Sequence, residues 1–268
     1  MNITVVGAGT IGEAISVALK NRGGYDVTAT RRNVSKIETL AGLGIRVSSK
    51  SEEAILDADV VILSLKPYDV LAFVKRNARV LAERTTISMA AALPPISAMA
   101  RYTGDGRLMR AMTNIAARVG GGFTVFCAPP GMQEREKREC RKILECFGEV
   151  MEVEEKYMDA LTAISGSGPA YILTVMEAMM YAGLKVGLPR DLALKASYET
   201  ILGSAKLVSE SGNHPSVLKD LVVTPGGVTI DAIYELEDSG IRTAFMRAIE
   251  SATIKSRKIS EEIASRDP

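Results

Sequence analysis

Short apolar runs alternate with segments of helical periodicity in the first part of the chain. Residues 3–6 form a β-branched run that meets the glycine-rich turn 7–12, and apolar residues at helical spacing then continue to Gly23 and Gly24. A second short run covers residues 27–30. A strand, a glycine turn, a helix and a strand make a βαβ unit, which requires a parallel sheet.

The same alternation continues to about residue 153. In chain order it predicts helix 35–43, strand 45–47, helix 52–56, strand 60–63, helix 70–81, strand 85–88, edge strands within 108–125, helix 133–147 and a last strand at 149–153. Apolar runs that are buried on both faces and separated by helices indicate a doubly wound, Rossmann-like α/β domain.

Beyond residue 158 the pattern changes to helices alone. Long helical segments are predicted at 169–186, 190–210, 228–239 and 241–265. We therefore expect a dinucleotide-binding domain at 1–158 and an all-helical domain at 159–268.

The helical part carries apolar residues on more than one helix face. In the first long segment these are Ile172, Leu173, Val175, Met176, Met179 and Met180. A helix that is apolar all round must be buried by other helices or by a partner chain. This favours a homodimer, or a higher multiple of dimers, in which helices of both subunits share one core.

Composition and charge exclude several classes of protein. Hydrophobic residues make up 47% and charged residues 24% of the 268 residues, as in soluble globular proteins, and the net charge is +1. We expect no nucleic-acid partner, no membrane partner and no signal peptide. The three cysteines form no CxxC pair, so we expect no metal site and a reducing, cytoplasmic compartment. With a single histidine, His214, any mechanism that needs two is excluded.

The glycine turn has the spacing and context of a dinucleotide-binding motif. The first glycine permits a tight turn, the second admits a diphosphate, and the third allows close packing of helix on strand. The diphosphate then meets the free amides of the helix N-terminus. The alternative is a glycine turn that binds nothing. The expected cofactor-binding residues of this turn are Gly7, Ala8, Gly9, Thr10, Ile11 and Gly12.

The end of the second predicted strand indicates which dinucleotide is bound. NAD enzymes usually carry an acid there to bond the ribose 2′-hydroxyl, whereas this chain has Arg31 and Arg32. Two guanidinium groups suit a 2′-phosphate, which predicts NADP(H), with NAD(H) as the second choice. The alternative is a solvated basic turn.

Four segments together resemble the pyrroline-5-carboxylate reductase family, nearly end to end. They are the glycine turn 7–12, the Leu-Lys-Pro of residues 65–67, the Ser-Gly-Ser-Gly-Pro-Ala-Tyr of residues 165–171, and residues 218–229 with their Thr-Pro-Gly-Gly-Val-Thr ending. The resemblance implies NAD(P)H-dependent hydride transfer to the imine carbon of 1-pyrroline-5-carboxylate, giving L-proline, in a dimer of intertwined helical domains.

The resemblance also implies roles for particular residues. Further cofactor contacts are implied for Ser51, Ser64, Leu65, Lys66, Pro67, Met89 and Ala90. The substrate is expected on a loop before a helix, formed by Val222, Thr224, Gly226, Gly227, Val228 and Thr229. Thr229 is the implied catalytic residue, with its hydroxyl on the ring nitrogen. Its alternative role is to cap its own helix.

The chain departs from the family pattern at residues 110–116. Where the family carries Arg-x-Met-Pro-Asn-Thr-Pro, this chain reads Arg-Ala-Met-Thr-Asn-Ile-Ala. The loss of both prolines predicts a less rigid loop, and a related enzyme with a shifted substrate is an alternative. His214, which precedes Pro215, matches a His-Pro pair of the family, and we expect a structural role for it.

Two rival functions remain open at this point. A β-hydroxyacid dehydrogenase-like enzyme would carry a lysine soon after the glycine motif of its second domain, but none occurs from Pro169 until Lys185. A non-catalytic NADP(H)-sensing protein would bind the cofactor without turnover. An assay with the imine substrate separates all three.

Overall fold

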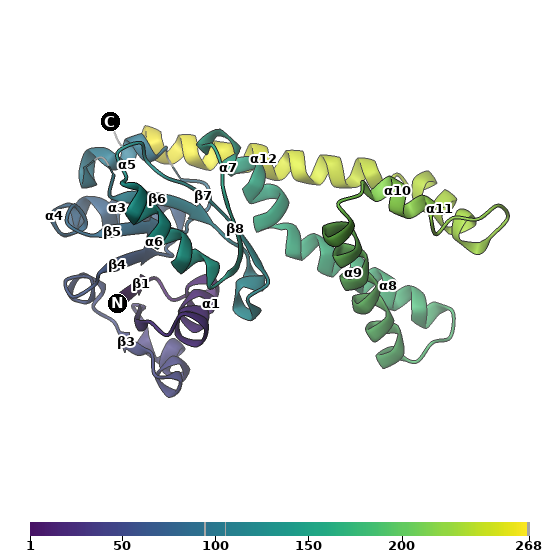
Figure 1. The fold of residues 1–268 in the computed structure, drawn as a ribbon, viewed down its shortest axis with the longest axis horizontal. Helices are drawn as coiled ribbons and strands as arrows, with labels where there is room; N and C mark the ends of the chain where they lie inside the picture. Colours follow the sequence, from purple (N-terminus) through teal and green to yellow (C-terminus); the bar gives the residue numbers. More distant parts are fainter. Residues whose placement is uncertain (94, 105, 267–268) are drawn as a thin grey trace. The chain divides into compact units, whose positions relative to one another are not determined.

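The chain divides into two compact units in a computed structural model that describes residues 1–93, 95–104 and 106–266. The first unit comprises Met1–Pro169 and Glu250–Pro268, and the second comprises Ala170–Ile249 (Figure 1). Each unit is described by itself below.

One sheet forms the centre of the first unit. In the described residues its order is β3-β2-β1-β4-β5-β6-β7-β8. The strands are β1 Asn2–Val6, β2 Asp26–Thr30, β3 Arg46–Ser48, β4 Val60–Leu63, β5 Thr85–Ser88, β6 Leu108–Met112, β7 Gly122–Cys127 and β8 Gly148–Glu152. All neighbours pair in parallel except β6 and β7, which are antiparallel. The predicted Rossmann-like fold is confirmed.

Helices cover both faces of this sheet because its central strands are apolar on both sides. In β4, Val60 and Ile62 join one core cluster while Val61 and Leu63 join the other. The first face is covered by α1 Thr10–Ala18 with its continuation η1 Leu19–Gly23, by η2 Val34–Leu43, η3 Ile115–Val119 and α6 Glu134–Glu145. The second is covered by α3 Pro67–Arg76, α4 Ala78–Leu81, α5 Ile96–Thr103 and the end of α12 Ile241–Ser265.

Several local expectations need correction. The segment 108–125 does not add edge strands, because β6 and β7 lie inside the sheet and β8 forms its edge. The predicted helix 70–81 is broken at Asn77, whose side-chain amide donates to the Phe73 carbonyl at 2.9 Å and so competes with the helical backbone. Helices α5 and α10 Pro215–Asp220 were not predicted, and neither were the shorter helical segments at 115–119 and 155–166.

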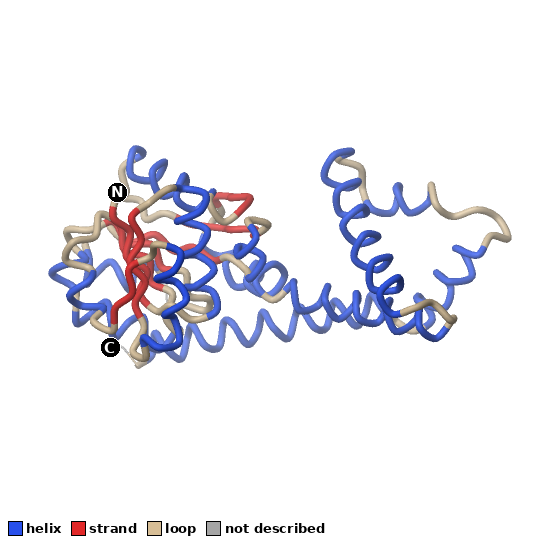
Figure 2. Tube along the Cα trace, turned by 90° about the horizontal axis from the view of Figure 1, so that it is seen from below, coloured by secondary structure: helices blue, strands red, loops and turns tan. Residues whose placement is uncertain are grey.

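The rest of the chain is helical, as predicted, and Figure 2 shows strands only in the first unit. Short turns η4 Glu155–Tyr157, α7 Met158–Leu161 and η5 Thr162–Gly166 follow β8. The long helices are α8 Gly168–Lys185, α9 Arg190–Ser211, α11 Val228–Asp238 and α12. Within the described residues, no helix is long and apolar enough to cross a membrane.

The compact units are not divided at residue 158. Residues 155–166 and the end of α12 belong to the first unit, where Ile263 is buried and Ile259 packs against the same core cluster. Apolar burial therefore ties the chain's last turns to the first unit. The predicted boundary at residue 158 separates a cofactor-binding domain from a dimerisation domain, and it stays a prediction.

Candidate active site

A cleft of about 1210 Å³ opens at the carboxyl ends of the central strands in the first unit. Ligands of open α/β sheets bind at this edge, where the strand order reverses between β1 and β4. Most of the predicted cofactor residues line it: Gly7, Gly9, Thr10, Ile11, Arg31, Arg32, Ser51, Ser64, Leu65, Lys66, Pro67, Met89 and Ala90. Ala8 and Gly12 do not line the cleft, because they are buried behind it.

The glycine turn between β1 and α1 forms one wall of the cleft. Gly7 has a φ of +93°, which side-chain-bearing residues rarely adopt, and a Cβ there would lie 2.6 Å from the Ser64 carbonyl oxygen. A Cβ on Gly12 would collide with the carbonyl oxygen of Gly7. A Cβ on Gly9 would meet nothing within 4 Å, although Gly9 lines the cleft. The first and third glycines are thus required by packing, whereas the second leaves open space in the cleft.

The first turn of α1 faces this space. The helix begins at Thr10, and no side chain caps its N-terminus, where Gly9 is the N-cap residue. The free amides of the first turn and the positive end of the helix dipole suit a diphosphate.

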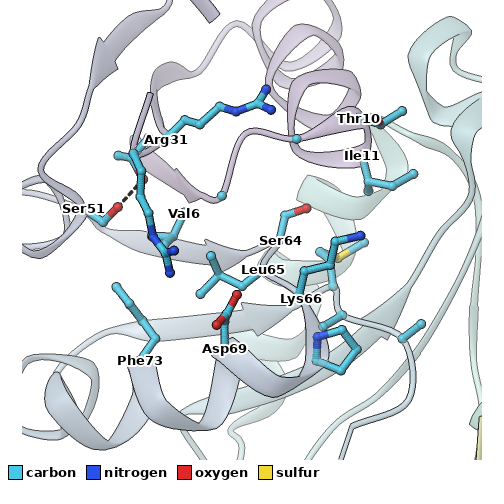
Figure 3. A pocket seen from close by; sticks show the side chains of 18 of the residues that line it. Val6, Thr10, Ile11, Arg31, Ser51, Ser64, Leu65, Lys66, Asp69 and Phe73 are labelled. Carbon is cyan, nitrogen blue, oxygen red and sulfur yellow. Dashed lines mark hydrogen bonds between the residues drawn. The ribbon is translucent and has the colours of Figure 1, made fainter. Parts of the chain in front are cut away.

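Arg31 and Arg32 differ in their surroundings. Arg31 Nη1 donates to the Ala8 carbonyl and to Glu13 Oε1, each at 3.1 Å, so its side chain extends toward α1 (Figure 3). Arg32 is exposed and makes no hydrogen bond or ion pair within the described part of the chain. Arg31 therefore braces the glycine turn, and Arg32 is the guanidinium with all its donors available.

A hydroxyl pair lies beside the arginines. The Oγ atoms of Thr30 and Ser51 are 2.7 Å apart, and this bond is drawn in Figure 3. Thr30 is fully buried at the end of β2, so it fixes Ser51 at the cleft wall. Ser51 is one of the residues for which the family resemblance implies a cofactor contact.

The opposite end of the cleft contains residues that were not predicted. They lie at the ends of β6 and η5 and at the residues that directly follow them, and they are Met112, Thr113, Thr162, Gly166 and Ser167. Met112 and Thr113 belong to the segment that departs from the family pattern, and Gly166 and Ser167 to the quoted Ser-Gly-Ser-Gly motif. Thr162 carries no recognisable signal in the sequence.

Side-chain hydrogen bonds restrain the segment in which the family pattern has proline. Asn114 donates to the Ser165 carbonyl at 3.0 Å and accepts from the Ala116 amide at 3.0 Å. Thr113 accepts from the Thr124 hydroxyl at 2.9 Å. Asn114 thereby links β6 to η5, on opposite sides of this end of the cleft.

The predicted substrate residues lie together in the second unit, on the loop that joins α10 to α11. The Gly227 amide donates to the Thr224 carbonyl at 3.0 Å, and Gly226 takes a left-handed φ of +68°. Helix α11 begins at Val228 without a side-chain cap. A tight turn thus leaves the first amides of an 11-residue helix free, which suits a small carboxylate.

Thr229 does not cap its own helix. Gly227 is the N-cap residue, and the Thr229 hydroxyl makes no hydrogen bond within the described residues. Thr229 is the second residue of α11, and it is half-buried. Its hydroxyl therefore remains available for a ligand.

The cysteines and the single histidine are either buried or have a structural role. Burial raises the pKa of Cys127 and of Cys140 to about 12, so both thiols are neutral at physiological pH. His214 Nδ1 lies 2.7 Å from the Ser216 hydroxyl at the start of α10, which gives it a capping role. Among the described residues, no group of three or more His, Cys, Asp or Glu side chains could hold a metal ion.

Two family models and several curated proteins match this chain. Residues 2–92 match the family described as NADP oxidoreductase, coenzyme F420-dependent, and residues 155–259 match the family described as pyrroline-5-carboxylate reductase dimerisation. The pyrroline-5-carboxylate reductase of Arabidopsis thaliana is 35% identical over 261 residues, which cover 96% of this chain and 94% of that protein.

Two solved structures agree with these matches. The pyrroline carboxylate reductase of Plasmodium falciparum, with NADP bound, gives a TM-score of 0.87 at 27% identity. The pyrroline-5-carboxylate reductase of Coxiella burnetii gives 0.84 at 30% identity. Each comparison covers 97% of this chain and 98% of the other.

Proposed function

The chain belongs to the pyrroline-5-carboxylate reductase family, and on this premise we propose how its own residues reduce 1-pyrroline-5-carboxylate to L-proline with NADP(H). One observation supports the cofactor site above all others: the space beside Gly9 is open. Gly9 stands between two glycines that packing requires, and it directly precedes the uncapped N-terminus of α1. These residues fit a dinucleotide diphosphate.

The reaction needs orientation more than acid–base chemistry. When bound, NADPH supplies a hydride that bonds to the imine carbon, while the C=N electron pair moves onto nitrogen and a protonated imine becomes a neutral amine. The protonated imine is already electrophilic, so the chain's residues need only position it and bond its nitrogen. This accords with a cleft that uses no histidine and no reactive thiol.

In this proposal, residues at the carboxyl edge of the sheet would hold the cofactor. The amides of the glycine turn would hold the diphosphate, and Ser51 and Arg32 would hold the adenosine half. Lys66, Met89 and Ala90, which line the cleft after β4 and β5, would hold the nicotinamide half. On the loop before α11, backbone amides bind the substrate carboxylate and Thr229 bonds the ring nitrogen.

Arg32→Ala is expected to weaken NADPH binding by about 10-fold or more and to leave NADH binding nearly unchanged. One charge-assisted phosphate contact is worth roughly 1.5–3 kcal/mol. Arg31→Ala should weaken both cofactors, because its loss releases the Ala8 carbonyl and Glu13. Titration of each variant with both cofactors measures the difference.

Arg79→Ala is the matched control, since Arg79 is exposed on α4 and lies outside the cleft. It should bind both cofactors as the parent does. Equal losses of NADPH and NADH affinity in Arg32→Ala would remove the 2′-phosphate assignment.

A homodimer is part of the proposal because the second unit leaves much apolar surface exposed. No residue of α8 or α11 is buried, and Leu202 on α9 and Tyr234 on α11 are 63% and 69% exposed. A second copy of the chain would cover these faces. The full chain should sediment as a dimer or a multiple of it at micromolar concentration. A monodisperse monomer under these conditions would contradict the shared core.

We also place the chain in a reducing, cytoplasmic compartment, on the support of its three free, buried cysteines. A steady-state assay tests the function itself. NADPH oxidation should depend on 1-pyrroline-5-carboxylate and yield L-proline. Cofactor binding without turnover would favour a sensing protein, and turnover only with a β-hydroxyacid would favour the dehydrogenase alternative.

A further inference from the structure

We propose that Arg110, a buried side chain of β6 that does not line the cleft, is a positioning residue that holds the two walls of the nicotinamide end in register. The proposal rests on the proposed function for its kinetic part. Its structural part concerns how β6 is joined to the segment η4–α7–η5, and this join exists without cofactor or substrate.

Arg110 binds two acidic residues from that segment. Its side chain is 4% exposed, its Nη1 lies 3.3 Å from Glu155 Oε1, and its Nη2 lies 3.9 Å from Asp159 Oδ1. Both carboxylates are held from a second side. Glu155 Oε1 accepts from the Ile96 amide at 2.8 Å, and Asp159 Oδ1 accepts from the Ser256 hydroxyl at 2.6 Å. One guanidinium thus joins β6 to α5, α7 and α12.

The joined segments lead directly into the cleft wall. Two residues after Arg110, β6 ends at Met112, and both Met112 and the next residue, Thr113, line the cleft. Three residues after Asp159, η5 begins at Thr162, which also lines it, as do Gly166 and Ser167 at the other end of η5. The guanidinium therefore sets how far apart these two walls stand.

Strand β5, which pairs with β6, contributes a further buried polar residue beside Arg110. Ser88 is the register partner of Arg110 across β5 and β6, and Met89 and Ala90 of the cleft follow it. The Ser88 hydroxyl is fully buried, and neither it nor Arg110 Nε has a hydrogen-bond partner in the described part of the chain. Arg110, Ser88 and the two carboxylates thus form a polar layer in which two buried atoms lack a hydrogen-bond partner among the described residues.

Net stability does not explain such a layer. Buried ion pairs contribute little compared with apolar residues of the same size, and unpartnered buried polar atoms are costly. Leu108 and Met112, two positions before and after Arg110 on β6, each belong to an apolar cluster, so apolar side chains pack well at neighbouring positions of this strand. What the guanidinium adds is a fixed geometry between two walls, and hydride transfer is sensitive to a displacement of about 1 Å, which costs on the order of 100-fold in rate.

The test compares Arg110→Lys, Arg110→Met and Asp159→Asn with Arg107→Met. Arg107 is a matched control, because it precedes β6 and pairs with Glu136 at 2.8 Å but lies outside the cleft. For each protein we would measure kcat, the KM of both substrates, the isotope effect with NADPH deuterated at the transferred position, and amide hydrogen exchange of residues 158–167 without cofactor.

Arg110→Met and Asp159→Asn should lower kcat by about 10-fold or more with the KM for NADPH nearly unchanged, because the adenosine end is untouched. The isotope effect on kcat should rise, and exchange at 158–167 should accelerate. Arg110→Lys keeps the charge but cannot bridge two carboxylates, so it should fall between these variants and the parent. Arg107→Met should match the parent in every measurement.

If Arg110→Met and Asp159→Asn only lower the melting temperature and leave the isotope effect and the exchange rate unchanged, the proposal is overturned. An equal loss of kcat in Arg107→Met would overturn it as well. If Arg110→Met does not fold, Asp159→Asn decides, since it keeps the side-chain shape and the acceptor for Ser256. If the parent protein does not reduce the imine, the proposed function fails, while the exchange measurement still decides whether Arg110 joins the two walls.

Discussion

Thr229→Val is expected to lower kcat/KM for the imine by roughly 10- to 150-fold. Valine keeps the shape of threonine but removes the hydroxyl, and one hydrogen bond to a group whose charge changes in the reaction is worth about 1.5–3 kcal/mol. NADPH affinity should barely change, because the glycine turn lies in the other unit. The backbone amides before α11 remain, so the carboxylate should still bind. Steady-state kinetics and cofactor titration measure both quantities.

Two measurements separate this effect from a loss of helix stability. Thr229→Ser retains the hydroxyl and should keep much of the activity. The melting temperature of the valine variant should stay close to that of the parent, since Thr229 caps nothing in the described structure. Full activity in a stable Thr229→Val protein would remove this residue from the mechanism and leave positioning by the loop backbone.

Gly9→Ala should weaken NADPH by roughly 5- to 150-fold while leaving the fold intact. The added methyl group meets no protein atom within 4 Å, and the backbone of Gly9 is extended, so an alanine fits there without strain. It would instead occupy the space assigned to the diphosphate, and overpacking of this kind costs about 1–3 kcal/mol. NADH should be weakened equally, because both cofactors carry the diphosphate. Calorimetric titration measures the affinities.

Gly12→Ala supplies the contrast within the same turn. Its methyl group would collide with the Gly7 carbonyl oxygen, so this variant should unfold at a lower temperature. Unaltered NADPH affinity in Gly9→Ala, or a fall in its melting temperature like that of Gly12→Ala, would show that the second glycine serves packing instead of the ligand.

Features carried by neighbouring residues were predictable from the sequence. The apolar run of β4 and the glycine turn each encode their structure within a few positions, which is why the Rossmann-like fold was predicted correctly. Asn77 broke a predicted helix because one side-chain amide competed with the backbone, and a periodicity of apolar residues does not register such a bond.

Features that depend on distant pairs were not predictable. The sequence identified Arg31 and Arg32 as a pair, but their different surroundings depend on Glu13, which lies 18 positions from Arg31. The same holds for Arg110, whose partners Glu155 and Asp159 follow it by more than 40 positions. Apolar periodicity reports which face of an element is buried and says nothing of which charged side chains meet across the fold.

The return of α12 to the first unit has a consequence for how the protein is made. Ile259 and Ile263 complete the core beneath α3 and α5, although every other part of that core is encoded before residue 110. During translation the cofactor domain would therefore hold an incompletely covered apolar core until residues 259–263 have left the ribosome. Shortened chains that end before residue 259 should be substrates for chaperones and proteases, even though they contain the complete sheet.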